Sequence, residues 1–349
     1  MSSPLRGQHG VTLVDVMAGL VVALLTVAVV YQSLVVVQAM RRNTASVGDM
    51  QATGTLALST LTIAIGNAGA GLASATRWLD TCPVVPDIAT TLRPVHVLIS
   101  DGGAAERPDT LFVRQSFARV SGIALPFAAD APIGSSFRIG GVDGISTGDR
   151  LVAISRSGTC VSSTATNVTN AGPGLLDVAH TPVDVALPVT SLLLNLGLAT
   201  RPSTARFDLV SGTLRSTDMT NGDAPNPLLS NVVNLKLQYG IDTDGDGTLD
   251  TWVSATPGPW DAATLLGAPR SMLERIKAVR VGLIARTDQP ERERTAAFNW
   301  VLFDCELDDK SACPGRLAGT IPSAAQGGYR YRTFEAIVPL RNTIWNAGP

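Results

Sequence analysis

The densest group of potential metal ligands is an acidic segment at residues 242–250. Its potential ligands are the side chains of Asp242, Asp244, Asp246 and Asp250 and the backbone carbonyl of Thr248. These residues occupy positions one, three, five, seven and nine of a calcium loop of the EF-hand type, and Gly247 stands at position six, where the backbone must turn sharply. We therefore predict a Ca²⁺ site at this loop.

The same segment departs from the EF-hand pattern in two respects. Position twelve is Val253 instead of a bidentate glutamate, and Asp261 completes the set only if the chain folds back. A strand is also expected before the loop, where an EF-hand has a helix. The alternative is a solvated acidic hairpin loop, which Asp-Gly repeats form without metal. Both interpretations stay open.

A second motif, Gly144 to Gly148, has the G-x-S-x-G form of a hydrolase nucleophile elbow, with Ser146 at its centre. The elbow requires a strand before the serine and a helix after it. Here glycines precede the serine and a strand is expected to follow, and His180 lies beside Thr181-Pro182 in an expected loop. We predict that the protein is not an enzyme.

The four cysteines form an even number, which suits disulfides in an oxidising compartment. Cys305 and Cys313 bracket a short polar loop and are the expected local pair, which leaves Cys82 to pair with Cys160. Zinc binding is the rival interpretation, and it is disfavoured because the sequence contains no C-x-x-C motif.

Composition sets the broad class. The net charge of -2 gives no reason to expect a nucleic-acid partner, and the Tyr329-Arg330-Tyr331-Arg332 run is predicted to be a sheet edge with solvated arginines. A low charged fraction of 16%, with 33 glycines and 21 prolines, indicates a loop-rich and strand-rich body.

The N-terminal region combines a short basic leader with a long apolar run. Between Asp15 and Arg41 there is no charged residue, and about 25 residues in a helix span roughly 37 Å, enough for a hydrocarbon core of ~30 Å. A secretory signal would carry its small residue after the apolar run, whereas here Gly10 precedes it. We predict one transmembrane helix with its N-terminus inside the cell.

This arrangement resembles the class III leader of type IV pilins and type II secretion pseudopilins. The resemblance implies cleavage by prepilin peptidase between Gly10 and Val11, N-methylation of Val11 and retention of the helix. It also implies that Asp15, at the mature fifth position where the family usually has glutamate, pairs with the terminal amine of a neighbouring subunit. The alternative is a plain membrane anchor with an incidental acid.

Later segments resemble minor pilins of the PilW type. The similar segments are Gly148–Val152, Leu237–Gly240, Val279–Val281 and Phe334–Asn342. The resemblance implies a minor pilin that primes or caps a type IV pilus, with other major and minor pilins as partners and a tip adhesin as a candidate partner. It implies a single pass through the bacterial inner membrane with a periplasmic ectodomain, then the pilus. The alternatives are a large tip pseudopilin of a type II secretion system and a membrane-anchored calcium-binding module that does not polymerise.

The expected fold class is α+β and pilin-like, with a large antiparallel β-rich ectodomain. The expected divisions are a leader at 1–10, a transmembrane and assembly helix at 11–40, its continuation at 41–71 and the β-rich domain at 72–349. The helix should pack by a stripe of Leu58, Leu61, Thr62 and Ile65 and end in the glycines of residues 66–71.

Alternation and turn residues predict the strands of the ectodomain. They fall at 110–114, 150–154, 207–215 with a turn at Ser211-Gly212, 233–239, 279–285 and 333–340. The alternation of apolar residues with Asn234, Lys236 and Gln238 predicts a half-buried strand. One later helix is expected over 260–276, interrupted at Pro269.

Overall fold

The computed structural model describes residues 13–72, 95–116, 124–141, 143–200, 204–219, 221–290, 297–305, 309, 313–322 and 328–344. The chain divides into two compact units, Met1–Asp49 and Met50–Pro349. The leader at 1–10, the predicted cleavage residues Gly10 and Val11, and Cys82 lie outside the described residues.

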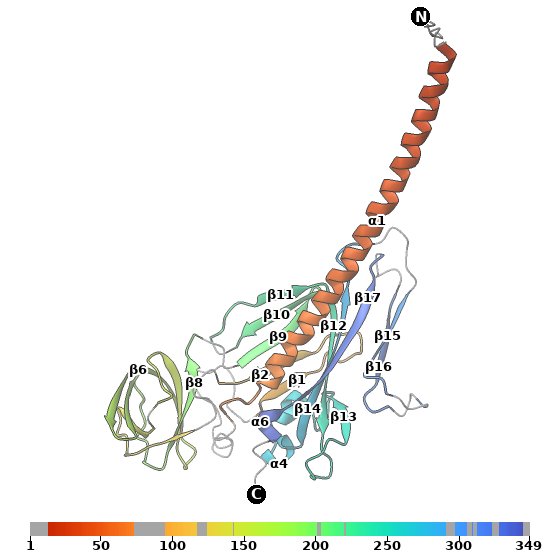
Figure 1. The fold of residues 1–349 in the computed structure, drawn as a ribbon. Coiled ribbons are helices and arrows are strands. Elements are labelled where there is room, and N and C mark those ends of the chain that lie inside the picture. Colours follow the sequence, from red (N-terminus) through yellow and green to blue (C-terminus); the bar gives the residue numbers. More distant parts are fainter. Residues whose placement is uncertain are drawn as a thin grey trace, which may run out of the picture. The chain divides into compact units, whose positions relative to one another are not determined.

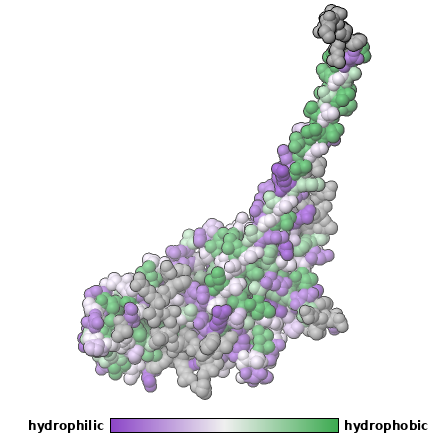
Figure 2. All heavy atoms as spheres, viewed as in Figure 1, coloured by the Kyte–Doolittle hydropathy of each residue, from purple (hydrophilic) through white to green (hydrophobic). Residues whose placement is uncertain are grey.

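The first unit is the N-terminal part of helix α1, which runs over Leu13–Gly66 (Figure 1). Large apolar side chains from Leu13 to Met40 are exposed, and Figure 2 shows this part of the helix as mostly hydrophobic. Its most apolar window of 18 residues has a mean hydropathy of 2.6, and none of it is buried. By length and composition, the helix is therefore able to cross a membrane.

The second unit contains the rest of α1, which buries one stripe. Met50, Ala57, Leu61 and Ile65 are buried at helical spacing, whereas the opposite side of the helix is exposed. The predicted stripe is confirmed for Leu61 and Ile65, but Leu58 and Thr62 are only half-buried margins of it. The helix ends where predicted, because Gly69 and Gly71 adopt φ of 76° and 75° in the turn that follows.

A four-stranded antiparallel sheet, in the order β13-β12-β14-β17, packs against this stripe (Figure 1). Its strands are β12 (Val232–Ile241), β13 (Thr251–Ser254), β14 (Ile276–Arg286) and β17 (Tyr331–Pro339). The strands predicted at 233–239, 279–285 and 333–340 are therefore confirmed, and β17 stands at the sheet edge as expected for Tyr331 and Arg332.

The half-buried character predicted for residues 233–239 is wrong. Asn234, Lys236 and Gln238 are all at most 4% exposed, because loops and a hairpin cover the second face of the sheet. Lys236 forms buried ion pairs with Asp101 and Asp109, and Asn234 donates to the carbonyl of Ala105. The polar residues that alternate along β12 lie on the second face of the sheet. Each of them is buried with a hydrogen-bond or ion-pair partner.

The covering hairpin consists of β15 (Phe298–Leu302) and β16 (Leu317–Ile321), with the Cys305–Cys313 disulfide beside it. Arg280 fixes it to the sheet: its guanidinium lies 4.8 Å from the Trp252 ring centroid and 4.4 Å from that of Phe303, and it donates to the Pro314 carbonyl at 2.6 Å.

The predicted local disulfide between Cys305 and Cys313 is confirmed. Cys160 is also disulfide-bonded. Its pairing with Cys82 stays a prediction, because Cys82 lies outside the described residues.

A five-stranded antiparallel sheet, in the order β1-β2-β9-β10-β11, lies beside the first sheet. Its strands are β1 (Val97–Ser100), β2 (Thr110–Arg114), β9 (Thr204–Val210), β10 (Thr213–Asp218) and β11 (Asn226–Ser230). The turn predicted at Ser211-Gly212 joins β9 to β10. The Ile99 amide donates to the Tyr239 hydroxyl at 2.6 Å and so joins the two sheets.

A third set of strands forms a closed antiparallel barrel in the order β3-β8-β5-β6-β7-β4. The strands are β3 (Leu125–Pro126), β4 (Phe137–Gly140), β5 (Asp149–Ile154), β6 (Cys160–Gly172), β7 (Leu175–His180) and β8 (Leu192–Leu198). The Phe127–Ile139 bridge and the bond from the Ala128 amide to the Arg138 carbonyl (2.8 Å) close the ring. The sequence predicted one strand of it, 150–154, and did not predict the barrel.

The described residues of the second unit also include three short helices: α3 (Ala262–Gly267), α4 (Arg270–Leu273) and α6 (Arg341–Ile344). Pro269 separates the first two, as predicted, and it is the N-cap residue of α4. The Asn342 amide donates to the Ala68 carbonyl at 2.8 Å, which links the C-terminal helix to the end of α1.

Gly54 is required by packing, although a glycine weakens a helix interior. A Cβ at this position would overlap the ring of Phe334 on β17. We predict that Gly54→Ala lowers the free energy of unfolding by roughly 1–3 kcal/mol, because overpacking outweighs the gain in helix propensity. Thermal unfolding of the wild-type protein and of Gly54→Ala measures this difference in stability.

The matched control is Gly48→Ala, because no atom lies within 4 Å of a Cβ at Gly48. It should cause no loss of stability. Phe334→Leu should also reduce the cost of Gly54→Ala, and equal losses in both backgrounds would contradict the steric explanation.

His96 is buried against the turn that ends α1. A Cβ at Gly69 would lie 2.8 Å from its ring, and its Nδ1 has no hydrogen-bond partner among the described residues. Burial, and secondarily the positive charge of Arg114, lower the pKa of His96 from 6.5 to about 4.

Because the unfolded chain takes up this proton first, the His96 contribution to stability is complete above pH 6.5 and is lost as the pH falls towards 4. We predict a loss of up to about 3 kcal/mol over this window. The difference between the pH–stability profiles of the wild-type protein and His96→Phe isolates this contribution from other titrating groups. Parallel pH–stability profiles for the wild-type protein and His96→Phe would contradict this prediction.

Candidate functional site

Two features have the chemistry of a functional site, and the first is the N-terminal part of α1. Asp15 lies in the first helical turn and is exposed. A carboxylate is favourable there because the positive end of the helix dipole is close. In a membrane this acid would be costly unless it met a positive charge. The predicted pairing with a neighbouring subunit therefore stays a prediction, as does cleavage at Gly10.

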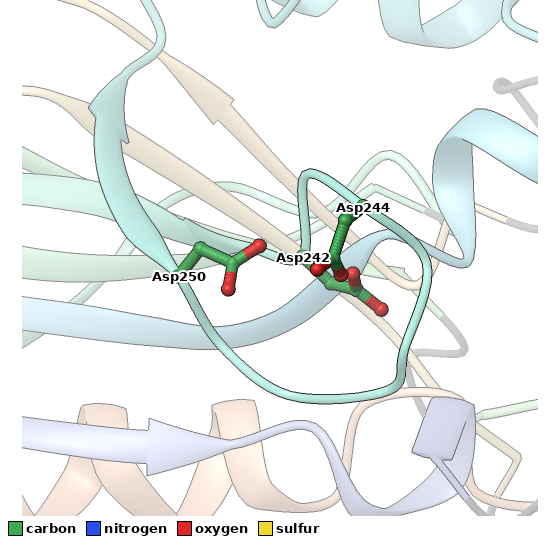
Figure 3. A group of neighbouring side chains, drawn as sticks. All are labelled: Asp242, Asp244 and Asp250. Atoms are coloured by element: carbon green, nitrogen blue, oxygen red, sulfur yellow. The ribbon is translucent and has the colours of Figure 1, made fainter.

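The second feature is the acidic loop, which joins β12 to β13 directly after the Ile241–Thr251 pair. Carboxylate oxygens of Asp242, Asp244 and Asp250 lie within 4.8 Å of one another and point into the loop (Figure 3). The structure thus brings together three of the five predicted ligand residues.

The other two predicted ligand residues bond to each other. Asp246 Oδ1 accepts from the Thr248 amide at 2.7 Å and from its hydroxyl at 2.6 Å, and Asp246 is not part of the converging group. An Asp246 ligand would therefore require this local turn to rearrange.

Asp242 organises the loop from its buried position, with 1% of its side chain exposed. It accepts from the amides of Gly245 (2.6 Å) and Gly247 (2.9 Å), and Lys277 Nζ lies 3.2 Å from its second oxygen. Loss of solvation acts to raise the pKa of Asp242, but these amides and Lys277 together hold it below its usual value.

Asp250 closes the loop from the other end. Its Oδ2 accepts from both the hydroxyl and the amide of Thr243 at 2.6 Å, and these bonds lower the pKa of Asp250. Asp242 and Asp250 are therefore held in the charged form, which is the form that a hard cation such as Ca²⁺ requires.

Asp261, the predicted candidate for completing the EF-hand set, does not contribute, and position twelve offers no carboxylate. Val253 pairs with Tyr239 in the sheet, and Asp261 is the N-cap of α3, where it accepts from the amides of Gly258 and Thr264. Strands flank the loop on both sides. The loop is therefore a strand–loop–strand site and not a helix–loop–helix one.

Sequence reasoning missed Lys277 and Arg275, which supply positive charge to this loop. Arg275 donates to the Thr243 carbonyl at 3.1 Å. Both residues reach the loop because Ile276 pairs with Ile241 across the sheet. No local pattern in the sequence marks them, since strand register alone brings them close.

The Gly144–Gly148 motif is an aspartate-capped turn. The Ser146 amide donates to Asp149 Oδ2 at 2.8 Å, and strand β5 begins at Asp149, as expected. The ring nitrogens of His180 lie 2.7 Å from the Thr181 carbonyl and 3.0 Å from that of Ser135. The Gly144–Gly148 motif is followed by a strand and not by a helix, so it is a structural turn and not a nucleophile elbow.

The helix and the sheets described above define the fold class. A long apolar N-terminal helix, whose continuation packs on the antiparallel sheet of a β-rich body, is the predicted α+β, pilin-like fold.

Comparison with known families gives a match over part of the chain. Residues 201–342 match the family model described as type IV pilus-assembly protein W. The match bears out the resemblance inferred from Leu237–Gly240, Val279–Val281 and Phe334–Asn342, which lie within these residues, whereas the leader and Gly148–Val152 lie outside them.

A type IV-like pilin from Thermus thermophilus is among the solved structures that are similar to this chain. The two are 16% identical, the alignment covers 57% of this chain and 85% of that one, and the TM-score is 0.24, which is too low to relate the folds in detail. No curated protein matches the chain.

Proposed function

We propose that the protein is a minor pilin that primes or caps type IV pilus assembly through its N-terminal helix. The observation that carries the proposal is the exposed apolar part of α1, from Leu13 to Met40, with Asp15 as its single acid. The family match over residues 201–342 supports the same role. The partners are prepilin peptidase, other pilins and the inner membrane that holds the helix before assembly.

In this proposal α1 has two successive environments. It is first anchored in the inner membrane and then packs among the helices of other pilins, and in both its apolar side chains avoid water. Asp15 sets the axial register with the terminal amine of the next subunit, because an unpaired carboxylate is unfavourable in either place. The ectodomain starts or ends the filament, where a tip adhesin is a candidate partner.

The first test is substitution of Asp15. Asp15→Ala should leave membrane insertion unchanged and reduce incorporation into sheared pili by at least tenfold, since the register charge is lost while the apolar helix is kept. Immunoblots of membrane and pilus fractions measure both quantities. Asp15→Glu is the matched control and should retain incorporation. Normal incorporation of Asp15→Ala would contradict the assembly role.

Processing is checked in the same material by mass spectrometry of the N-terminus. We expect mature chains to begin at an N-methylated Val11. An intact leader would favour the alternative of a tethered ectodomain, and incorporation into a type II secretion pseudopilus instead of a pilus would favour the tip-pseudopilin alternative.

A second proposal concerns the acidic loop, which we infer to bind Ca²⁺ as a structural ion through Asp242, Asp244 and Asp250, with Asp246 and Thr248 as the remaining predicted ligands. The convergence of three carboxylates within 4.8 Å supports it. Lys277 competes with the ion for Asp242, so the affinity should be that of a weak, extracellular type of site.

Calorimetry with Ca²⁺ tests this proposal. Asp244→Asn should weaken binding by at least tenfold, because it removes one charged ligand of the converging group. Ca²⁺ should raise the thermal unfolding temperature of the wild-type protein and of the control, and raise that of Asp244→Asn less. Asp261→Asn is the matched control, because Asp261 caps α3 instead. Absence of binding heat in the wild-type protein would contradict the proposal.

A further inference from the structure

The barrel of residues 124–200 is inserted within a single hairpin of the five-stranded sheet. Strands β2 and β9 are direct antiparallel neighbours, and Arg114 and Thr204 are paired residues at their ends. The chain therefore leaves the sheet after Arg114, builds the barrel and returns beside the point at which it left. Adjacent chain ends are the usual arrangement where one domain is inserted into another.

The barrel has a hydrophobic core of its own. Phe137, Ile139, Leu151, Val178 and Leu193 are at most 1% exposed and belong to one buried cluster, whose members all come from residues 127–193. The ring of strands is also closed by backbone hydrogen bonds, so its strands are paired with one another. Its length lies in the range in which single domains fold alone.

The barrel docks on the rest of the second unit, residues 50–116 and 204–344, which we call the body. Leu72, just after α1, packs on the outer face of β5 and β8 against Val152, Ile154, Leu194 and Leu196. Polar contacts run from the Ser116 hydroxyl to the Asn195 carbonyl at 2.7 Å, and from Arg150 to Asn221 at 3.1 Å. This docking face is separate from the barrel core, since its residues form a different cluster.

We propose that the barrel is an inserted folding module on which neither the fold of the body nor assembly through α1 depends. The match to the pilus-assembly family begins at residue 201, after the barrel, and extends over most of the body strands. The chain thus separates an assembly part from a part that the assembled protein displays. The clause on assembly rests on the proposed function; the clause on folding does not.

Amide hydrogen exchange of the full-length protein in detergent micelles tests the folding clause. Leu151→Ala removes a fully buried side chain from the barrel core, and Leu283→Ala removes one from β14 of the body. Leu151→Ala should raise exchange of the slowest barrel amides by at least roughly twentyfold and leave those of β12 and β14 unchanged. Leu283→Ala, the matched control, should do the reverse.

Tryptophan fluorescence gives an independent reading, because residues 124–200 contain no tryptophan whereas Trp252 and Trp300 lie in the body. Leu283→Ala should shift the fluorescence-detected unfolding transition, and Leu151→Ala should not. Equal acceleration of exchange in barrel and body by both substitutions, with equal shifts in fluorescence, would overturn the proposal.

Excision tests the assembly clause. Residues 117–202 are replaced by Asn-Gly, so that a five-residue loop joins Arg114 to Thr204, a normal length for a hairpin connection. Leu72→Ser and Cys82→Ser accompany the excision, to avoid an exposed apolar side chain and an unpaired thiol. This variant should unfold cooperatively and enter pili at a level within twofold of the wild-type chain.

The outcomes separate the two proposals. If the wild-type chain enters pili and the excised chain does not, or if the excised body does not fold, the barrel proposal is overturned. If the wild-type chain itself does not enter pili, the proposed function fails, and the exchange experiment still decides whether the barrel is a separate folding module.

Discussion

The structure depends on one contact, the burial of the α1 stripe from Met50 to Ile65 against the four-stranded sheet. An apolar helix that has to remain available to a membrane or to other helices cannot also be covered by its own body. On α1, most of the described apolar side chains before residue 41 are exposed, and the later part buries a narrow stripe. Gly54 shows how close this contact is, because the Phe334 ring occupies the space of a side chain there.

The sheet that receives the helix is buried on its second face as well. The Arg280 guanidinium, held between Trp252 and Phe303, connects that face to the disulfide-bearing hairpin, and Lys236 is neutralised there by Asp101 and Asp109. Buried charges of this kind are costly unless they are paired, so these groups fix one arrangement of loops over the sheet. The acidic loop between β12 and β13 then extends from a rigid support.

Local patterns predicted much of the fold. The helix end at Gly66, the strands that contain Leu237, Val281 and Ala336, the break at Pro269 and the Cys305–Cys313 pair all follow from spacing along the chain. The barrel could not be predicted in this way, because its closure depends on pairing between Phe127 and Ile139 and between β5 and β8, which no local pattern records. For the same reason Lys277 was missed at the acidic loop, and the loop itself was found because its carboxylates are neighbours in sequence.

The position of β17 has a consequence for how the protein is made. The partners of the α1 stripe include Phe334 and Val338, and Asn342 donates a hydrogen bond to Ala68. The first described segment of the body therefore packs against the last one. Closing so large a chain loop is slow, since its entropy cost precedes any gain from contacts. The contact between the α1 stripe and β17 therefore cannot form before residues 331–339 have been synthesised, and a chaperone that shields this part of the stripe would act until then.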